Sequence, residues 1–411
     1  MRLPLTSLAE KVQIFKSLRY PNFRIYFFGM LATAFGHPMR QVAMLWLVYK
    51  LTGSALDLGL VGGTEGAASI AFTIIGGTLA DRVDRRRLLI LTSFSLLILL
   101  FLLAAFTAMG LVKMPHLLVF AFLFGAISCI DGPTRLALLP SLIGGRKDLM
   151  NATALISTIW QTSRIMGPAI AGILVAFSPA ICFFITSATY LVMVIALSRI
   201  KFEKVDSSEG GKIRSSPWEG VKYVWRNSIF SSIIGMVLVN SLFGMSFIFI
   251  LPIFAGDILQ VDSRGFGLLL TFMGVGSLTG VLLGATLGGF KKKYILLLGN
   301  SVLFGLLLML FSSAHQYSVA AIVIVLAGFT QHLYMLTAAT LIQYLVPDEI
   351  RGRVMALYSL VWFLTPLGGL QAGAVASYLG VPAAIAIGGG VVVSFTIFLL
   401  IAVPRLRKLD V

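Results

Sequence analysis

The sequence has little charge: Asp, Glu, Lys and Arg make up only 12% of its 411 residues, whereas 58% are hydrophobic. Soluble domains devote roughly a quarter of their residues to charge, so a soluble globular fold is excluded. The mean hydropathy of +0.96 predicts a membrane protein instead. A spanning helix needs about 20 apolar residues, so about twelve spans would fill the chain and leave no room for a sizeable soluble domain.

Cysteine is nearly absent, and the two that occur, Cys129 and Cys182, both fall inside hydrophobic runs. Neither a disulfide framework nor a metal cluster is expected, and we predict no cofactor. Enzyme signatures are missing too, because the chain has no His-Glu-x-x-His, Walker or Gly-x-Ser-x-Gly motif. The first residues lack the apolar core and cleavage site of a signal peptide, so we expect no cleaved leader.

The net charge of +16 is unevenly distributed along the chain. Lys and Arg gather in every second connection between hydrophobic runs: 2–24, 82–87, 146–147, 199–226, 291–293, 351–353 and 405–408. The intervening connections hold little beyond Lys50, Lys113 and Arg264. This asymmetry follows the positive-inside rule and predicts that both termini are cytoplasmic. The basic loops are then expected to contact membrane lipid rather than nucleic acid.

Hydrophobic runs predict an all-α membrane protein with twelve spans. They lie near 23–50, 57–80, 88–110, 116–139, 149–176, 180–199, 229–255, 265–288, 294–313, 318–346, 355–379 and 382–403. Residues 201–227 are the one long polar stretch between them. We therefore predict an N-terminal six-helix bundle over 1–200, a cytoplasmic linker with an interfacial helix over 201–227, and a C-terminal six-helix bundle over 228–411.

The two halves repeat one another. With an offset of 208 residues, Gly59-Leu60 falls on Gly267-Leu268, Gly76 on Gly284 and Arg85 on Lys293. A looser match places Ala171-Gly172 and Pro179 on Ala372-Gly373 and Pro382. Parallel repeats of six spans make two bundles related by pseudo-two-fold symmetry around a central cavity.

The connection after the second span reads Gly77-Thr-Leu-Ala-Asp81-Arg82-Val-Asp84-Arg85-Arg86-Arg87. It resembles the signature of the major facilitator superfamily, Gly-x-Leu-Ala-Asp-Arg-x-Gly-Arg-Arg, except that Asp84 replaces the usual Gly. The resemblance implies a conformational latch in which Gly77 permits close helix packing and Asp81 faces a helix amino end and pairs with Arg. A plain positive-inside loop is the alternative.

The likeness implies further latch residues at the end of the fourth span. Similar transporters place partners of the latch arginines, here Arg82, Arg85 and Arg86, where this chain has Asp131 and Arg135. The alternative is a simple pair between residues one helical turn apart.

Other segments resemble a narrower group that contains the enterobactin exporter and macrolide efflux proteins. They are Asn22-Phe-Arg24, Trp46-Leu-Val-Tyr49-Lys-Leu-Thr52-Gly53-Ser54, Asp131-Gly-Pro133-Thr-Arg135 and Pro347-Asp-Glu-Ile-Arg351-Gly-Arg353-Val. The fifth span also follows the spacing of the superfamily's antiporter motif, with three glycines replaced by Ala or Ser. Its residues are Ala154, Ser163, Gly167, Pro168, Ala171 and Gly172. The group implies efflux, and the motif implies a seal on one face of the cavity; ordinary small-residue packing is the alternative.

Ionisable residues inside spans are costly and tend to be functional. Glu65 is the one acid in the outer half of the first bundle, with Arg40 at similar depth and His37 one turn away, so these three are candidates for proton coupling. A structural ion pair between Glu65 and Arg40 is the alternative. Arg164, near the middle of the fifth span, is predicted to bind an anionic group or to balance Asp131.

Polar and aromatic residues of the first, fifth, seventh, tenth and eleventh spans are candidates for lining the cavity, as those spans do in similar proteins. They are Gln41, Trp160, Gln161, Arg164, Asn240, Phe247, Gln331, His332, Tyr334 and Trp362. Helix packing is the alternative reading of each.

These features favour a monomeric, multi-pass transporter of the bacterial inner membrane. The leading hypothesis is a proton-coupled exporter of small amphipathic molecules that works by alternating access. A lysolipid flippase or an uptake facilitator of the same fold is the alternative. A membrane-embedded enzyme or receptor is the least favoured reading.

Overall fold

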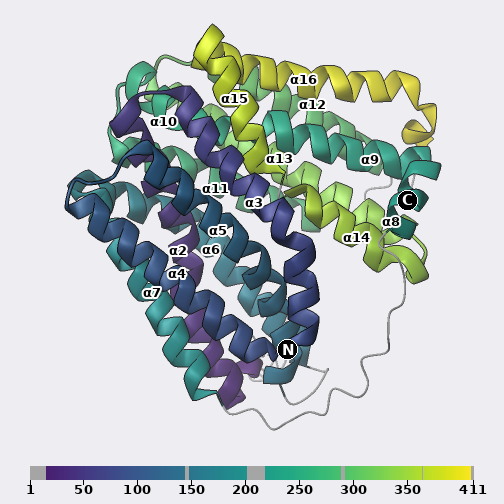
Figure 1. The fold of residues 1–411 in the computed structure, drawn as a ribbon. Coiled ribbons are helices and arrows are strands. Elements are labelled where there is room, and N and C mark those ends of the chain that lie inside the picture. The colour runs from purple at the N-terminus through teal and green to yellow at the C-terminus, as the bar shows by residue number, and fades with distance from the viewer. Residues whose placement is uncertain (1–14, 144–147, 201–217, 288–291, 363, 409–411) are drawn as a thin grey trace, which may run out of the picture.

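A computed structural model of the chain describes residues 15–143, 148–200, 218–287, 292–362 and 364–408. Within these helices the side chains of 74–82, 218, 219, 362, 407 and 408 are not described. The described chain is almost wholly helical, and its helices form two bundles that lie side by side (Figure 1). Most of the predicted linker, 201–217, lies outside the described residues.

The first bundle contains six long helices in alternating directions, as the sequence predicted. They are α2 (Pro21–Thr52), α3 (Ala55–Arg82), α4 (Arg85–Ala108), α5 (Met114–Leu138), α6 (Leu149–Phe177) and α7 (Pro179–Arg199). Two short turns, η1 (Lys16–Arg19) and η2 (Leu139–Leu142), lie at one end of this bundle. Gly53 ends α2 in the left-handed conformation, with φ of 60°, which glycine adopts without steric cost.

The second bundle repeats this arrangement. Its first span is a composite of α9 (Ser228–Val239), η4 (Asn240–Gly244), α10 (Phe247–Ile253) and η5 (Phe254–Ile258). It continues with α11 (Ser263–Thr286), α12 (Lys293–Ser312), α13 (Tyr317–Leu345), α14 (Asp348–Trp362), α15 (Thr365–Leu379) and α16 (Val381–Ala402). The short α8 (Trp218–Arg226) and η7 (Pro404–Lys408) flank these spans.

Two features of the second bundle differ from the continuous spans that the hydrophobic runs predict. The turns η4 and η5 are π-helical, so the seventh span is wound unevenly at two places. The eleventh span is broken into α14 and α15, and Pro366 follows the break at the start of α15, where its missing N–H costs no helical hydrogen bond. Hydropathy alone does not register either feature.

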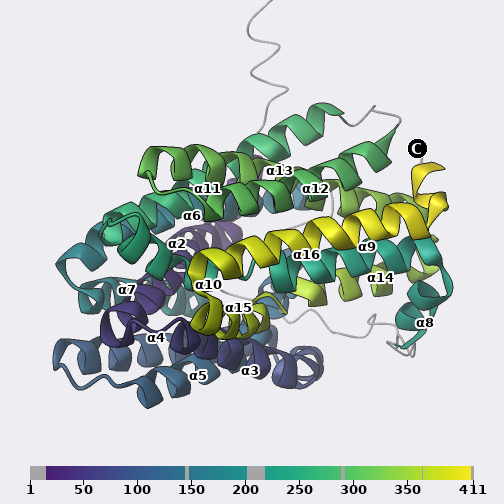
Figure 2. The same cartoon turned by 90° about the horizontal axis from the view of Figure 1, so that it is seen from above.

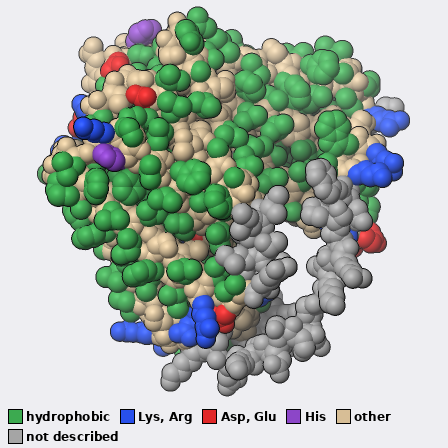
Figure 3. Space-filling view, viewed as in Figure 1, with side chains coloured by type: hydrophobic (Ala, Val, Ile, Leu, Met, Phe, Trp, Pro, Cys, Tyr) green, Lys and Arg blue, Asp and Glu red, His purple; other side chains and the backbone are tan. Residues whose placement is uncertain are grey.

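The surface is that of a membrane protein. Nine of the described helical stretches are long and apolar enough to cross a bilayer; α2, α3 and α6, with 28 to 32 residues, are as long and carry Arg40, Glu65 and Arg164. Hydrophobic side chains cover most of the visible face, and Lys and Arg gather along its lower and right margins (Figure 3). We call the end of the molecule that carries η1, η2, α8 and η7 the basic end, and the other the opposite end.

The ribbons of the two bundles diverge towards the basic end (Figure 1). At the opposite end, α6 lies beside α11 and α3 lies beside α15, on two sides of the molecule (Figure 2). We call these two helix pairs the seams. They are the places where the first and second bundles pack most extensively.

Candidate functional site

Glycine pairs build both seams, and they are related by the internal repeat. A Cβ on Gly59 of α3 would lie 3.0 Å from Cα of Gly373 in α15, and a Cβ on Gly267 of α11 would lie 2.9 Å from Cα of Gly172 in α6. Gly59 and Gly267 are repeat equivalents, and so are Gly172 and Gly373. Each seam is thus the counterpart of the other, with backbones too close for any larger residue.

Polar contacts between backbone and side chain hold the α6–α11 seam. Ser263 Oγ donates to the Gly172 carbonyl at 3.0 Å, and Thr271 Oγ1 donates to the Ile165 carbonyl at 2.8 Å. Trp46 of α2 stacks on Phe266 of α11, with ring centroids 5.6 Å apart. These contacts lie in the half of the molecule nearer the opposite end.

The antiporter-type residues divide between packing and exposure. Ser163, Gly167, Pro168, Ala171 and Gly172 are all buried. Gly167 faces Pro38 of α2, and Pro168 and Gly172 face α11. Ala154 is exposed near the basic end of α6 and takes no part in this packing.

One hydrogen bond joins the bundles close to the pseudo-two-fold axis. The hydroxyl of Tyr49, near the end of α2, donates to Asp257 Oδ1 in η5 at 2.6 Å. The two residues are 208 positions apart, which is the offset of the repeat. Repeat equivalents that touch each other must lie on the axis relating the halves. The sequence analysis did not predict this pair.

Arg40 and Glu65 meet inside the first bundle. Arg40 Nη2 lies 2.6 Å from Glu65 Oε1, and Nη1 lies 3.2 Å from Oε2, so the pair is bidentate. The Arg40 side chain is 6% exposed and that of Glu65 is 19% exposed. The guanidinium also lies 4.6 Å from the ring centroid of Phe124. The predicted proximity of Arg40 and Glu65 is therefore present in the structure.

Arg164 reaches from the first bundle to the second. Its Nη1 lies 3.2 Å from Nε2 of His332 in α13, and both residues sit near the middle of their helices. Arg164 is exposed although it contacts the other bundle, so its guanidinium faces the space between the bundles. His37 of α2 is exposed as well, and it lies close enough to Arg164, Arg40 and Glu65 to sense their charges.

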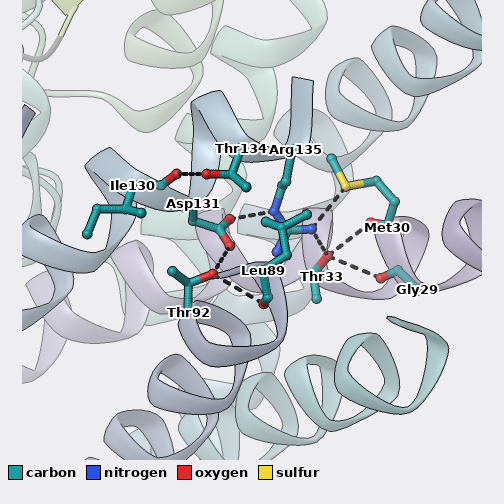
Figure 4. A network of polar contacts seen from close by, with 9 residues as sticks. All are labelled: Gly29, Met30, Thr33, Leu89, Thr92, Ile130, Asp131, Thr134 and Arg135. Carbon is teal, nitrogen blue, oxygen red and sulfur yellow. Dashed lines mark hydrogen bonds and ion pairs between the residues drawn. The ribbon is translucent and has the colours of Figure 1, made fainter. Parts of the chain in front are cut away.

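Asp131 and Arg135 form a buried network of polar contacts (Figure 4). Arg135 Nε pairs with Asp131 Oδ2, and Asp131 Oδ1 accepts a hydrogen bond from Thr92 at 2.8 Å. Arg135 also contacts Met30 Sδ at 3.3 Å and Thr33 Oγ1 at 3.5 Å. This turn-spaced ion pair ties α5 to α2 and α4. Its role as part of the latch stays a prediction, because the side chains of Asp81 and Arg82 lie outside the described ones.

The described arginines after the second span bind backbone carbonyls. Arg85 Nη1 donates to Ala137 at 3.0 Å, whereas Arg86 donates to Leu197 at 2.8 Å and to Ser198 at 2.7 Å. These contacts lie within the first bundle, at its basic end. The side chains of residues 74–82, which include Gly77, Asp81 and Arg82, are not described. The latch role of these three residues therefore stays a prediction.

Asp84, the departure from the superfamily signature, has a local role. It is the N-cap residue of α4, and its Oδ1 accepts a hydrogen bond from the backbone N–H of Arg87 at 2.8 Å. A capping carboxylate satisfies an amide that the first turn leaves unpaired. The replacement of Gly by Asp therefore suits the start of the third span.

Four predicted cavity residues are instead buried inside the second bundle: Asn240, Phe247, Gln331 and Tyr334. Gln331 Nε2 donates to Asn240 Oδ1 at 2.8 Å, and both side chains are at most 1% exposed. They face neighbouring helices because the composite seventh span packs against α13. Of the others, Trp160 and Arg164 are exposed, and Gln41, Gln161 and His332 are half-buried. The side chain of Trp362 lies outside the described ones.

The sequence analysis missed a polar cluster at the basic end, in which one carboxylate meets two basic side chains and a tyrosine. Asp148, just before α6, lies 3.0 Å from Lys16 and 2.7 Å from Arg19, and accepts a hydrogen bond from Tyr20 at 2.8 Å. The Tyr20 hydroxyl and the Lys16 ammonium lower the pKa of Asp148 below its ordinary value. This cluster ties the entry of α2 to the start of α6, and no motif announces it.

Comparison with known proteins agrees with this architecture. The family model described as transmembrane secretion effector matches residues 13–411. Over 366 residues the chain is 26% identical to the staphyloferrin A transporter of Staphylococcus aureus, covering 87% of this chain and 90% of that protein. It is 24% identical over 402 residues to the multidrug efflux pump Tap of Mycolicibacterium fortuitum, covering 93% and 96%. The enterobactin exporter EntS of Salmonella choleraesuis is 24% identical over 349 residues, covering 83% and 82%.

Solved structures share the fold. A bacterial homologue of the lysosomal transporter Spinster in an inward-facing, unoccupied conformation superposes with a TM-score of 0.74 at 15% identity, covering 96% of this chain and 97% of that one. A bacterial homologue of the iron transporter ferroportin in an inward-facing state gives a TM-score of 0.70 at 16% identity, covering 92% and 98%. Both identities are low, so these likenesses concern the fold alone.

Proposed function

The chain belongs to the transmembrane secretion effector family of the major facilitator superfamily, and from this premise we propose that it is a proton-coupled exporter of small amphipathic molecules. The observation that carries the proposal is the bidentate Arg40–Glu65 pair, an ionisable pair inside a transporter bundle. The proton is the coupling ion, the transporter acts as a monomer, and it needs no metal or organic cofactor.

Relatives support the direction of transport. The printed names of two similar proteins describe an efflux pump and an exporter, and a third is named as a transporter of staphyloferrin A. We propose that the basic end and both termini face the cytoplasm and that the chain resides in the bacterial inner membrane, since cytoplasmic loops carry the excess of Lys and Arg. Substrate would then enter from the end where the bundles diverge.

Alternating access requires two arrangements of the bundles, and the seams supply one of them. Their glycine contacts close the opposite end, while the basic ends stand apart (Figure 1). Opening towards the other side requires the α3–α15 and α6–α11 contacts to separate and the basic ends to come together. A rigid-body rocking of two bundles about a central site accomplishes this exchange.

We propose that protonation of Glu65 changes the relative free energy of the two arrangements of the bundles. An ionised Glu65 holds Arg40 by two charge-assisted hydrogen bonds, and a neutral Glu65 retains only a weaker contact. Removing the charge therefore frees Arg40 and alters the packing of α2 on α3. The latter helix forms one of the two seams with α15. A coupling ion acts only through such a differential effect on the two states.

Transport in inverted membrane vesicles tests the proposal. Vesicles that contain the full-length protein are energised with an acid interior and offered a siderophore, a macrolide and a cationic dye. Native protein is expected to accumulate at least one of these only under the gradient. Glu65→Gln should abolish gradient-driven accumulation while leaving exchange of substrate across the membrane, because the neutral amide cannot release a proton.

The control is Arg264→Gln, which changes an exposed arginine at the opposite end. It should accumulate substrate as the native protein does. Accumulation that is independent of the gradient and unchanged in Glu65→Gln would refute proton coupling. That result would favour the uptake facilitator or lipid flippase.

A further inference from the structure

Arg164 differs from the other arginines inside the membrane. Arg40 is paired with Glu65 and Arg135 with Asp131, and both arginines are buried, at 5% and 7% exposed. Arg164 is exposed, and no described carboxylate forms an ion pair with it. An unpaired charge at this depth costs about 2.5 to 3.5 kcal/mol on insertion scales, so such a residue is expected to serve a ligand.

His332 is a neutral partner that leaves Arg164 available. A guanidinium has only donors, so Nε2 of His332 must accept the hydrogen bond, and the imidazole proton then resides on Nδ1. This contact uses one of the five N–H groups of Arg164. The histidine steadies the guanidinium in the space between the bundles without neutralising its charge.

The charges around Arg164 do not cancel it. Glu65 does not pair with it, because both of its carboxylate oxygens are engaged by Arg40. His37 and His332 contribute no negative charge. The space between the bundles therefore holds one uncompensated positive charge contributed by described side chains.

An apolar surface lies beside this charge. Trp160 precedes Arg164 by one helical turn on the same side of α6, and it is 37% exposed. A planar cation next to an indole face accommodates a ligand that has both a flat apolar portion and a carboxylate, because the carboxylate binds the guanidinium in two parallel hydrogen bonds.

We propose that Arg164, with Trp160 beside it and His332 across from it, forms the binding site for the carboxylate of an aromatic or otherwise amphipathic anionic substrate. This inference rests on the proposed transport function and specifies the substrate class. The substrate carboxylate supplies the negative charge that the chain itself does not. His332 belongs to the second bundle and Arg164 to the first, so their contact places the guanidinium that would bind the carboxylate between the bundles.

Two dyes that differ only in charge at one group test the site. Rhodamine 110 carries a free carboxylate, and rhodamine 123 is its methyl ester. Fluorescence anisotropy measures the binding of each to the purified full-length protein in nanodiscs of uncharged lipid. The native protein should bind rhodamine 110 more tightly. Arg164→Gln should weaken binding of rhodamine 110 by about tenfold or more and change binding of rhodamine 123 by less than about threefold.

Two variants separate a binding role from a structural one. Arg164→Lys keeps the charge without the planar fork and should restore part of the preference for the carboxylate. Arg264→Gln, the same change outside the site, should leave both affinities unaltered. Equal binding of the two dyes, equal losses for both in Arg164→Gln, or no binding of either dye overturns the inference.

The binding readout is independent of the proposed function. If the carboxylate preference is lost in Arg164→Gln but no proton gradient drives any transport by native vesicles, the proton-coupled exporter is wrong and the anion site stands. If native vesicles pump rhodamine 123 under a gradient and neither dye depends on Arg164, the exporter stands and the anion site is wrong.

Discussion

The interiors of the two bundles are built from different chemistry. The first bundle buries two ion pairs, Arg40 with Glu65 and Asp131 with Arg135. The second bundle, over its described spans, buries a neutral amide pair, Asn240 with Gln331. The two seams, by contrast, are chemically alike, because equivalent glycine pairs form both of them.

This contrast separates two requirements of a rocking transporter. The seams must close and open about a central axis, so both halves keep small residues at equivalent positions. Response to a proton needs a group that changes charge, and one such group in one bundle is sufficient. The internal repeat accounts for the shared seams, and the buried ion pairs of the described chain lie in the first half.

The largest effect is expected from breaking a charged pair of the first bundle. Arg135→Leu leaves Asp131 buried with Thr92 as its remaining hydrogen-bond partner. An unpaired buried charge costs about 3 to 5 kcal/mol. We expect a marked fall in the thermal unfolding temperature of the purified protein in detergent micelles. The double variant Asp131→Asn/Arg135→Leu should recover part of the loss, because the stranded charge is removed.

Gln331→Leu is the matched change in the second bundle. It strands an amide rather than a carboxylate, so the expected cost is about 1 to 3 kcal/mol. If the two single variants are equally destabilised, the difference between the charged and neutral interiors has no energetic consequence. A double variant that is as unstable as Arg135→Leu would likewise contradict the stranded charge as the cause.

The sequence predicted the spans well because the membrane imposes a length and an apolar composition on each helix. The predicted run 149–176 and the observed α6, Leu149–Phe177, differ by one residue. Side-chain partners were harder. Glu65 and Arg40 were placed together by depth alone, whereas nothing in the sequence indicated that Arg85 and Arg86 would bind the carbonyls of Ala137, Leu197 and Ser198.

Buried faces could not be read from helices that are apolar on all sides. Gln331 directly precedes His332 and Tyr334 follows it by two residues, yet Gln331 and Tyr334 are buried in the second bundle and His332 meets Arg164. The packing of the helices decides which of these residues faces the other bundle, and hydropathy carries no signal of that packing. Tyr49 and Asp257 are separated by the repeat offset, but so are Gly59 and Gly267, which lie in different seams, so the offset alone does not predict a contact.

The next effect tests the symmetry of the seams. A Cβ on Gly59 would lie 2.6 Å from the carbonyl oxygen of Gly369, and a Cβ on Gly267 would collide with the carbonyl oxygen of Pro168. Backbone atoms cannot rotate away, so each Gly→Ala variant should weaken its seam by about 1 to 3 kcal/mol. Distances between spin labels on the two bundles at the opposite end should lengthen equally in both variants.

Gly299→Ala is the control for these changes, because a Cβ there meets nothing within 4 Å. Its label distances should match those of the native protein. A lengthening in only one of the two seam variants would show that the seams are not energetic equivalents, despite their matching geometry.

A smaller effect is expected at the axis. Tyr49→Phe removes the hydrogen bond to Asp257, which is worth about 1 kcal/mol, and should shift the equilibrium between closed and open seams about fivefold. The same label distances report this shift. Asp257→Ala alone and the double variant should match Tyr49→Phe, since all three lose one bond. Additive shifts would mean that Tyr49 and Asp257 act through different partners.

The smallest effect concerns Asp148, a carboxylate of the first bundle that lies outside the membrane. Tyr20 and Lys16 lower its pKa, so its contribution to stability is complete above the pKa of an unfolded aspartate, about 3.9, and is lost as pH falls through the lower value of the folded protein. The unfolding temperatures of native protein and Asp148→Asn should therefore differ at neutral pH and converge below about pH 4.

Salt distinguishes this surface cluster from the buried pairs. The Lys16 and Arg19 side chains are 35% and 57% exposed, so counterions should reduce the difference between native protein and Asp148→Asn. The Arg135→Leu difference should persist at the same ionic strength, because Asp131 and Arg135 are shielded from solvent. Equal salt sensitivity of the two would indicate that water and counterions reach Asp131 and Arg135 as they reach Lys16 and Arg19.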